Sequence, residues 1–349
     1  MSVQTVTKVI KKEDLKVVTP HEHIFIKLTN FYEERNLKDC PNPSTCPVTI
    51  DKLGILNRDP YALRDNLIMD DYETQKKEIL RFKNAGGATV VDATMPGIGR
   101  DPLLLKKIEE DTGLNVIMGT GFYVYSSHPE EMKNMTEEQI ADLMVKEIEE
   151  GAEGTGVKAG VIGEIGISEI FNEEERRVLR ASAMAHKKTG VGVLVHINPW
   201  TTNGIESVQI LLEKGVKPNR IAISHIDVEN RLDYILTLLK MGVYVEFDNF
   251  GKEYYVNREV RNSGYGLFVR DIDRVKLLKY LIDNGYRSQI LLSCDVCLKT
   301  CLRTYGGWGY DHLLTNVIPM MEDEGITKED IDAMLITNPA NFLDNDKGE

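Results

Sequence analysis

Short apolar runs alternate with longer amphipathic stretches along most of this chain. Eight of the apolar runs are rich in β-branched residues and lack regular polar alternation, which is typical of strands covered on both faces. The pattern predicts strands at 16–21, 88–94, 115–121, 159–166, 192–198, 220–226, 242–248 and 289–295.

The stretches between these runs carry helix signals. Thr136 with Gln139 forms a capping-box pattern, and Asn172 with Glu175 repeats it. Two later segments place apolar residues at helical spacing. These residues are Leu232, Ile235, Leu236 and Leu239 in the first segment, and Val275, Leu278 and Ile282 in the second.

Strands that alternate with helices indicate a parallel sheet with helical crossovers. An open doubly wound sheet would normally carry a glycine-rich phosphate loop after its first strand, and none is present there. The predicted fold is therefore α/β, a closed (β/α)8 TIM barrel, with residues 1–349 forming a single domain. Residues 31–70 do not fit the alternation and indicate a long excursion with a short helix near 60–67.

Composition narrows the class of protein. The hydrophobic content of 42% and the charged content of 28% favour a folded core. The net charge of −13 opposes general binding to nucleic acid or anionic membranes. No secretory signal and no membrane-length apolar run is visible, so we expect a cytoplasmic protein with a small-molecule substrate. The sequence leaves a homodimer open.

The five cysteines are Cys40, Cys46, Cys294, Cys297 and Cys301. Because their number is odd and the chain is large, we expect free thiols in a reducing compartment. The last three lack a second pair at zinc-finger spacing, so a cysteine metal site is not expected.

Candidate chemistry begins with His21 and His23, which are two residues apart at the end of the first predicted strand. In a strand, residues i and i+2 point to the same face, so the two imidazoles converge. Converging neutral imidazoles suit a divalent transition metal.

Further polar residues end other predicted strands. The carboxyl ends of barrel strands meet at one face, where the active sites of this fold form. Carboxylates in covered strands are costly to bury without a cationic partner, and a dinuclear metal centre would provide one. These residues are Glu164, His196, His225 and Asp295.

Two other residues are interpreted as structural. Asp227 is read as the N-cap of the helix after the sixth strand, with a proton relay as its alternative role. His186 lies near a charged helix end, and we expect it to be solvated.

Several motifs together resemble a known family. They are HEH, GVIGEIG, VHINP, ISHID and LLSCDVC at strand ends, followed by YGGWGYDHLLTN and NPANFL. The chain resembles the phosphotriesterase-like family of the amidohydrolase superfamily, and is most similar to the phosphotriesterase-related branch. The resemblance covers nearly the whole chain.

The resemblance implies a site for two divalent metal ions, expected to be zinc. Carried over by position, His21, His23 and Asp295 hold the buried ion, and His196 and His225 hold the more exposed one. A carboxylate from the fourth strand bridges the two ions. Many members supply a carboxylated lysine there, whereas this chain has Glu164.

The implied activity is hydrolysis of an amide, ester or lactone by a metal-bridging hydroxide. Asp295 is the predicted catalytic residue, which accepts the proton and returns it to the leaving group. Two alternatives stay open: a phosphoester or phosphotriester hydrolase, and a metal-binding barrel without catalysis.

Substrate preference is expected to come from the loops. The segments 251–270 and 296–310 carry an excess of cationic side chains in an acidic protein, which favours a substrate with an anionic group. Lys252, Lys299 and Arg303 are the candidate contacts in these loops, and Tyr123 is a fourth candidate after the third strand.

Overall fold

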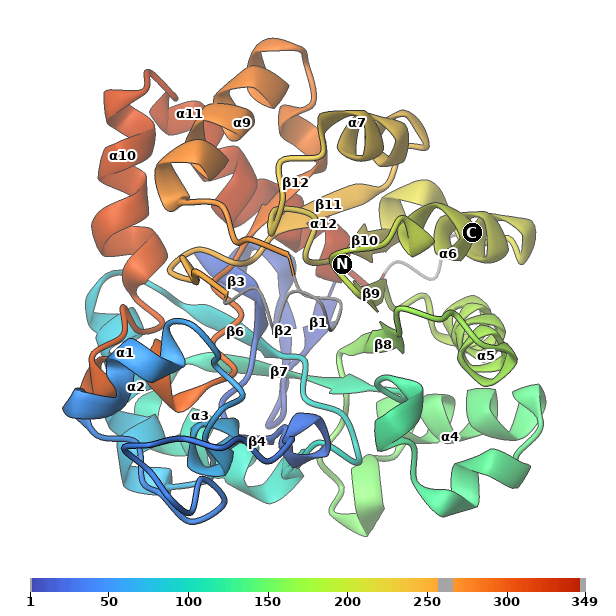
Figure 1. The fold of residues 1–349 in the computed structure, drawn as a ribbon. Coiled ribbons are helices and arrows are strands. Elements are labelled where there is room, and N and C mark those ends of the chain that lie inside the picture. The colour runs from blue at the N-terminus through green and yellow to red at the C-terminus, as the bar shows by residue number, and fades with distance from the viewer. Residues whose placement is uncertain (1, 257–265, 346–349) are drawn as a thin grey trace.

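Eight parallel strands lie side by side in chain order, and helices surround them in a computed structural model (Figure 1). The structure describes residues 2–256 and 266–345. Residues 257–265 of the predicted cationic loop are outside the described residues. The barrel strands are β3 (Val18–Glu22), β6 (Thr89–Asp92), β7 (Asn115–Thr120), β8 (Val161–Ile167), β9 (Val193–Ile197), β10 (Ile221–Ile223), β11 (Tyr244–Phe247) and β12 (Ile290–Leu292). Each predicted apolar run overlaps one of them, and β3 and β8 each extend one residue past their runs, so the predicted α/β barrel is confirmed.

Helices connect consecutive strands and cover the outside of the sheet (Figure 1). The connecting helices are α2 (Tyr72–Asn84), α3 (Pro102–Thr112), α4 (Glu137–Glu149), α5 (Glu173–Thr189), α6 (Asn203–Glu213), α7 (Leu232–Lys240) and α9 (Asp271–Asp283). After β12 the chain forms α10 (Ile318–Asp323), α11 (Lys328–Asp332) and α12 (Asn338–Leu343). Among the described residues, no helix combines the length and apolar character needed to cross a membrane.

Helix starts follow the sequence signals only in part. The capping box of Thr136 and Gln139 is present at α4. At α5, the Asn172 side chain accepts a hydrogen bond from Glu175 N, but the Glu175 carboxylate does not return to the cap. It accepts instead from Ser168 and from the backbone of Tyr125. The predicted second capping box is therefore wrong, because tertiary donors occupy the carboxylate.

The first and last barrel strands are joined by hydrogen bonds at the carboxyl end of the barrel. The backbone N–H of Asp295 donates to the His21 carbonyl at 3.2 Å. The Ser293 hydroxyl donates to the same carbonyl at 2.6 Å. These bonds join the two edge strands, β3 and β12, of the nearly closed barrel. At the opposite, amino end, a hairpin of β1 (Ser2–Gln4) and β2 (Val9–Lys11) buries Val3 against the barrel interior.

The excursion after β3 has a small core of its own. It contains β4 (Ile26–Lys27), α1 (Leu53–Leu56), a short 3-10 helix at Arg64–Leu67 inside the predicted range, and β5 (Ile68–Met69). Its buried residues are Cys40, Val48, Leu56, Ala62 and Leu63.

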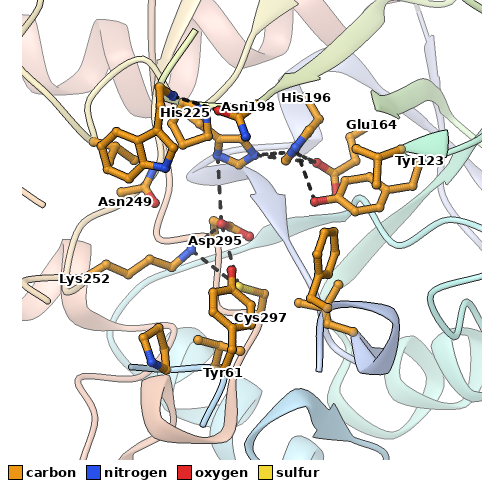
Figure 2. A pocket seen from close by; sticks show the side chains of 18 of the residues that line it. Tyr61, Tyr123, Glu164, His196, Asn198, His225, Asn249, Lys252, Asp295 and Cys297 are labelled. Atoms are coloured by element: carbon orange, nitrogen blue, oxygen red, sulfur yellow. Dashed lines mark hydrogen bonds and ion pairs between the residues drawn. The ribbon is translucent and has the colours of Figure 1, made fainter. Parts of the chain in front are cut away.

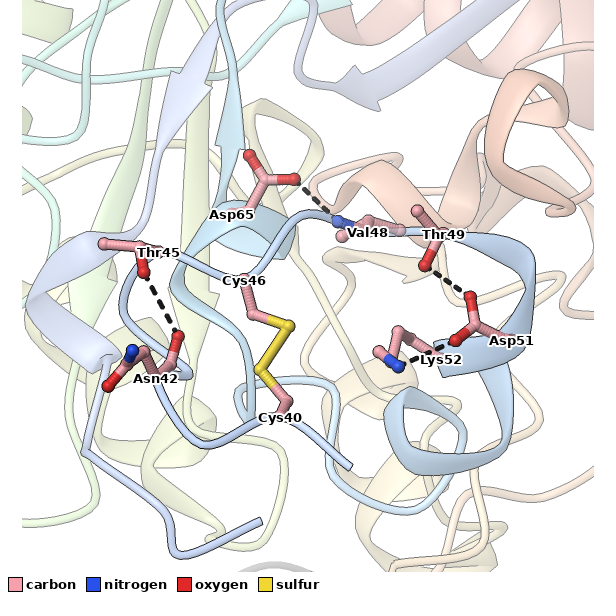
Figure 3. Close-up of a disulfide and its surroundings, with 9 residues drawn as sticks. All are labelled: Cys40, Asn42, Thr45, Cys46, Val48, Thr49, Asp51, Lys52 and Asp65. Carbon is pink, nitrogen blue, oxygen red and sulfur yellow. Dashed lines mark hydrogen bonds and ion pairs between the residues drawn. A yellow bond between two sulfur atoms is a disulfide. The ribbon is translucent and has the colours of Figure 1, made fainter. Parts of the chain in front are cut away.

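Cys40 and Cys46 form a disulfide within this excursion (Figure 3), with Cα atoms 6.3 Å apart. The expectation that all five cysteines are free is therefore wrong for this pair. The chain between them turns back on itself, which a cysteine count cannot show. Cys294, Cys297 and Cys301 are free.

Two further expectations are wrong. Asp227 does not cap α7, which begins five residues later. It is buried and paired with Arg274 at 3.0 Å. His186 is buried rather than solvated, and its Nδ1 lies 2.7 Å from the Val191 carbonyl oxygen.

Candidate active site

Six side chains from five barrel strands gather at the carboxyl end of the barrel. His21 lies within β3, Glu164 within β8 and His196 within β9, where the strand direction carries them into the barrel mouth. His23, His225 and Asp295 follow the ends of β3, β10 and β12. The structure thus brings together every residue that the sequence nominated as a metal ligand.

Glu164 lies between two groups of ligands. Its Oε1 is 3.4 Å from His23 Nε2, while its Oε2 is 3.3 Å from His21 Nε2. On the other side, Oε2 is 3.1 Å from His196 Nδ1 and 3.7 Å from His225 Nε2. Figure 2 shows Glu164, His196 and His225 facing one another. A carboxylate in this position can bridge two ions.

The donor atoms form sets that could each hold a metal ion. One set is His21, His23 and Asp295, and another is Glu164, His196 and His225. Asp295 Oδ1 is 3.1 Å from His23 Nε2. His21 Nε2 is buried, and among the described residues it makes no hydrogen bond, although Glu164 Oε2 lies 3.3 Å away. A buried nitrogen without a partner is costly in an apoprotein and is satisfied by coordination, so the residues present fit a metal.

The opposite ring nitrogen of each histidine is held by a neighbouring polar group. His23 Nδ1 lies 2.9 Å from Thr94 Oγ1, and His196 Nε2 lies 3.4 Å from the Tyr123 hydroxyl. His225 Nδ1 lies 3.0 Å from Asp248. Such partners fix the ring orientation and tautomer of metal-binding histidines.

His21 Nδ1 has the most crowded surroundings of the four. It is 3.1 Å from Ser224 Oγ and 3.2 Å from Glu246 Oε2. Sequence reasoning missed Glu246 and Asp248. Both carboxylates lie in the covered segment GVYVEFD, and the argument from burial cost that identified Glu164 would have found them as well.

The electrostatic field of the cluster favours positive charge. Burial opposes protonation of His21, but the Glu164 and Glu246 carboxylates together outweigh it and raise the His21 pKa well above its usual value. Burial likewise opposes protonation of His225, yet Asp248 raises its pKa to about 10. A site that stabilises cations in this way is suited to divalent ions, which would displace the ring protons.

Two of the six residues have backbone conformations that residues other than glycine rarely adopt. His225 has φ of 58° and Asp295 has φ of 45°, both in the left-handed region. Such strain costs on the order of 1–3 kcal/mol per residue and persists where the surroundings enforce it. Both residues are thus held in place by contacts with their surroundings.

A cavity of about 250 Å³ opens above the cluster. Its walls are largely apolar and include two aromatic groups. Phe31, Tyr61 and Tyr123 form one group, and Trp200, Tyr254 and Phe268 form the other. The site therefore offers a polar floor under apolar walls, a combination typical of small-molecule pockets.

Lys252 is the one lysine or arginine among the described residues that line this cavity. It is 5% exposed, its ammonium is paired with Asp295 Oδ2, and it lies 3.5 Å from Cys297 Sγ (Figure 2). Burial lowers the Lys252 pKa, but the Asp295 carboxylate raises it further, to well above its usual value. The same pair, against the opposing effect of burial, lowers the Asp295 pKa.

Of the three other predicted substrate contacts, one lines the cavity and two do not. Tyr123 lines the cavity. Lys299 and Arg303 do not line it, since Lys299 pairs with Asp65 at 2.6 Å and Arg303 pairs with Asp311 at 2.9 Å. Nearby acids thus neutralise both side chains, which a local excess of cations in the sequence does not reveal.

Comparison with known proteins places this geometry in a family. A model of the Phosphotriesterase family matches residues 1–343. The chain belongs to the phosphotriesterase family. Proteins of this family are binuclear metal enzymes, and the His/Asp clusters described above are suited to metals.

The similar proteins include named hydrolases and solved structures with the same fold. An N-acetyltaurine hydrolase from Xenopus tropicalis is 37% identical, with 98% of this chain and 97% of the relative covered. A resiniferatoxin-binding protein from Rhodobacter sphaeroides has a TM-score of 0.94 at 31% identity, covering 98% and 95% of the two chains. A mutant PTE-like lactonase from Deinococcus radiodurans has a TM-score of 0.76 at 26% identity, covering 98% and 100%. The phosphotriesterase-family chain is a metal-dependent hydrolase.

Proposed function

We propose that this enzyme hydrolyses the amide bond of small N-acylated compounds that carry an anionic group, such as a sulfonate or carboxylate. The observation that supports it is the position of Lys252, which is buried beside Asp295 and is the one lysine or arginine among the described residues that line the cavity. A substrate anion would find its charge-assisted partner there. The 37% identity with an N-acetyltaurine hydrolase agrees with this chemistry, because that relative's substrate is a sulfonate.

The proposed ligand assignment follows the two donor sets. His21, His23 and Asp295 would hold one zinc ion, His196 and His225 the other, and Glu164 would lie between them. When bound, two divalent ions supply Lewis-acid chemistry, because they polarise the scissile carbonyl and lower the pKa of a water. No lysine modification would be needed, since Glu164 would provide the bridging carboxylate.

The protein's own groups supply the rest. Asp295 is kept ionised by its surroundings, so its carboxylate can accept the proton of the attacking water and deliver it to the departing amine. Lys252 would bind the anionic end of the substrate, and Tyr123 lies on the opposite side of the cluster, where it can contact the acyl group. The apolar walls exclude bulk water from the reacting bond.

A lactone is the second candidate substrate, and the 26% identical lactonase favours it. Both reactions pass through attack on a carbonyl, so the site could serve either. A phosphotriester differs in having no carbonyl and, as a neutral molecule, no partner for Lys252. The hydrolase relatives oppose the alternative of a barrel without catalysis.

The decisive experiment compares three substrates on one preparation. Protein stripped with a chelator and reloaded with zinc is assayed on N-acetyltaurine, a γ-lactone and an aryl phosphotriester, with Asp295→Asn as the inactive control. We expect kcat/KM to be about tenfold or more higher for N-acetyltaurine. A higher value for either of the other substrates, or activity that survives chelation, contradicts the proposal.

Zinc, a cytoplasmic location and a homodimer belong to the same proposal and need their own tests. Elemental analysis of the purified protein identifies the metal, and light scattering gives the assembly. The Cys40–Cys46 disulfide is uncommon in a reducing compartment, so its redox state in cells tests the location.

A further inference from the structure

Glu22 lies between the two histidines of the HEH motif and points away from the metal cluster. Adjacent residues of a strand face opposite sides, so His21 and His23 enter the barrel mouth while Glu22 turns toward the seam between β3 and β12. Its side chain is completely buried. The roles described for the site do not use this carboxylate.

The Glu22 carboxylate binds the backbone on both sides of Asp295. Oε1 accepts a hydrogen bond from Cys294 N at 2.9 Å, and Oε2 accepts one from Val296 N at 2.8 Å. The Ser293 hydroxyl lies 2.8 Å from Oε1. Every donor comes from the short segment that carries Asp295 out of β12.

This segment needs such support because Asp295 itself is strained. Its φ of 45° is unfavourable for a residue with a side chain. The backbone N–H of Asp295 donates to the His21 carbonyl, so the N–H groups of Cys294 and Val296 are the other backbone donors beside Asp295. Glu22 holds both of them, and a carboxylate is the side chain that can accept at two oxygens at once.

We propose that Glu22 is a positioning residue for Asp295, which fixes the strained segment 294–296 so that the Asp295 carboxylate meets the metal and the reacting water. One residue of the motif would thus orient the ligand on the last strand while its two neighbours supply ligands on the first. The activity readout below rests on the proposed function, whereas the metal readout does not.

The test is Glu22→Gln, which keeps the volume but replaces one acceptor oxygen with an NH2 group. Whichever way the amide turns, a donor then faces the N–H of Cys294 or Val296, and the segment must shift. We expect the affinity for Co(II), titrated by its visible absorption, to fall about 10–100-fold, with an altered spectrum. We expect kcat to fall by a similar factor while KM changes little.

The matched control is Glu78→Gln. Glu78 in α2 is equally buried and accepts from two backbone amides, Arg303 N and Thr304 N, and from the Thr304 hydroxyl, but it does not contact the metal cluster. Both variants should lower the melting temperature, whereas only Glu22→Gln should weaken metal binding. Equal metal affinity in Glu22→Gln and wild type, or an equal loss in Glu78→Gln, overturns the proposal.

Should Glu22→Gln fail to fold, Glu22→Asp keeps the carboxylate but draws it back by one methylene from Cys294 N and Val296 N. A smaller loss of Co(II) affinity in the same direction supports the proposal, and unchanged affinity overturns it. Wild-type protein that binds no metal would instead contradict the proposed function, so the two failures are distinct.

Discussion

Asp248 holds His225 at two points. Its carboxylate accepts hydrogen bonds from the His225 backbone N–H at 2.9 Å and from the ring Nδ1 at 3.0 Å. Because a carboxylate can only accept, Nδ1 carries the proton and Nε2 is left to face the cluster. The backbone contact also supports the positive φ of His225. One carboxylate therefore sets both the conformation and the tautomer of this residue.

Asp248→Asn should weaken metal binding about 10–100-fold. An asparagine amide can place its NH2 group toward His225 Nδ1, so this residue would no longer select the tautomer that carries the proton on Nδ1. Isothermal titration with zinc measures the change. Asp271→Asn is the matched control, since Asp271 also accepts from a backbone amide, Gly251 N, and from a ring, His312 Nε2 at 2.7 Å. Equal zinc affinity in the two variants would contradict the assignment.

Lys252→Met should discriminate between anionic and neutral substrates. The variant keeps most of the side-chain length but removes the one lysine or arginine lining the described cavity. We expect KM for N-acetyltaurine to rise about tenfold or more, as for loss of a buried charge-assisted hydrogen bond. The neutral amide N-ethylacetamide is the control substrate. Loss of the contact between Lys252 and Asp295 affects both substrates equally. The fold-change in kcat/KM for N-acetyltaurine, divided by that for N-ethylacetamide, therefore measures the contribution of the substrate's charge. An unchanged ratio means that the substrate anion binds elsewhere.

His186 should make the stability of the protein depend on pH. Burial lowers its pKa below 6.5 in the folded state, so at mildly acidic pH the unfolded chain binds more protons than the native one. The contribution of His186 to stability is complete above pH 6.5 and declines as the pH falls below that value. Urea unfolding at pH 7.5 and 5.5 should show a smaller loss for His186→Gln than for wild type. An identical loss would show that His186 does not contribute.

Removal of the Cys40–Cys46 disulfide should destabilise the excursion that provides Pro60 and Tyr61 to the cavity. For so short a loop, the chain-entropy model gives about 2 kcal/mol. Thermal unfolding of the double Cys→Ala variant, compared with wild type with and without a reductant, measures it. The reductant should lower the wild-type midpoint and leave the variant unchanged. If the reductant does not change the midpoint temperature of the wild-type protein, the disulfide does not form.

The barrel could be read from the sequence because its strands are covered on both faces. That environment selects continuous apolar runs, and each of the eight runs became a strand. Polar side chains were harder to place, since their partners come from distant segments. Asp227 was assigned to a local helix cap, but Arg274, 47 positions further along, takes it into the core.

The six residues that gather at the barrel mouth could also be found from the sequence, because each stands at or beside the carboxyl end of an apolar run, where active sites of this fold form. The contacts by which neighbouring residues orient them could not, although burial cost alone would have singled out a carboxylate such as Asp248. Glu22 and Asp248 act through backbone amides, and nothing in a residue pattern shows which amide a carboxylate will meet. Lys299 illustrates the converse, because its charge was visible in the sequence and its partner Asp65 was not.

The bonds that join β3 to β12 have a consequence for synthesis. His21 and Ser293 contact each other across 272 positions of the chain. During translation His21 and His23 are synthesised early and Asp295 near the end. For most of its synthesis the growing chain therefore lacks one of the six residues of the cluster. Under the proposed ligand assignment, metal capture would follow completion of the chain, and amino-terminal fragments that stop before the last strand should be unable to retain both ions.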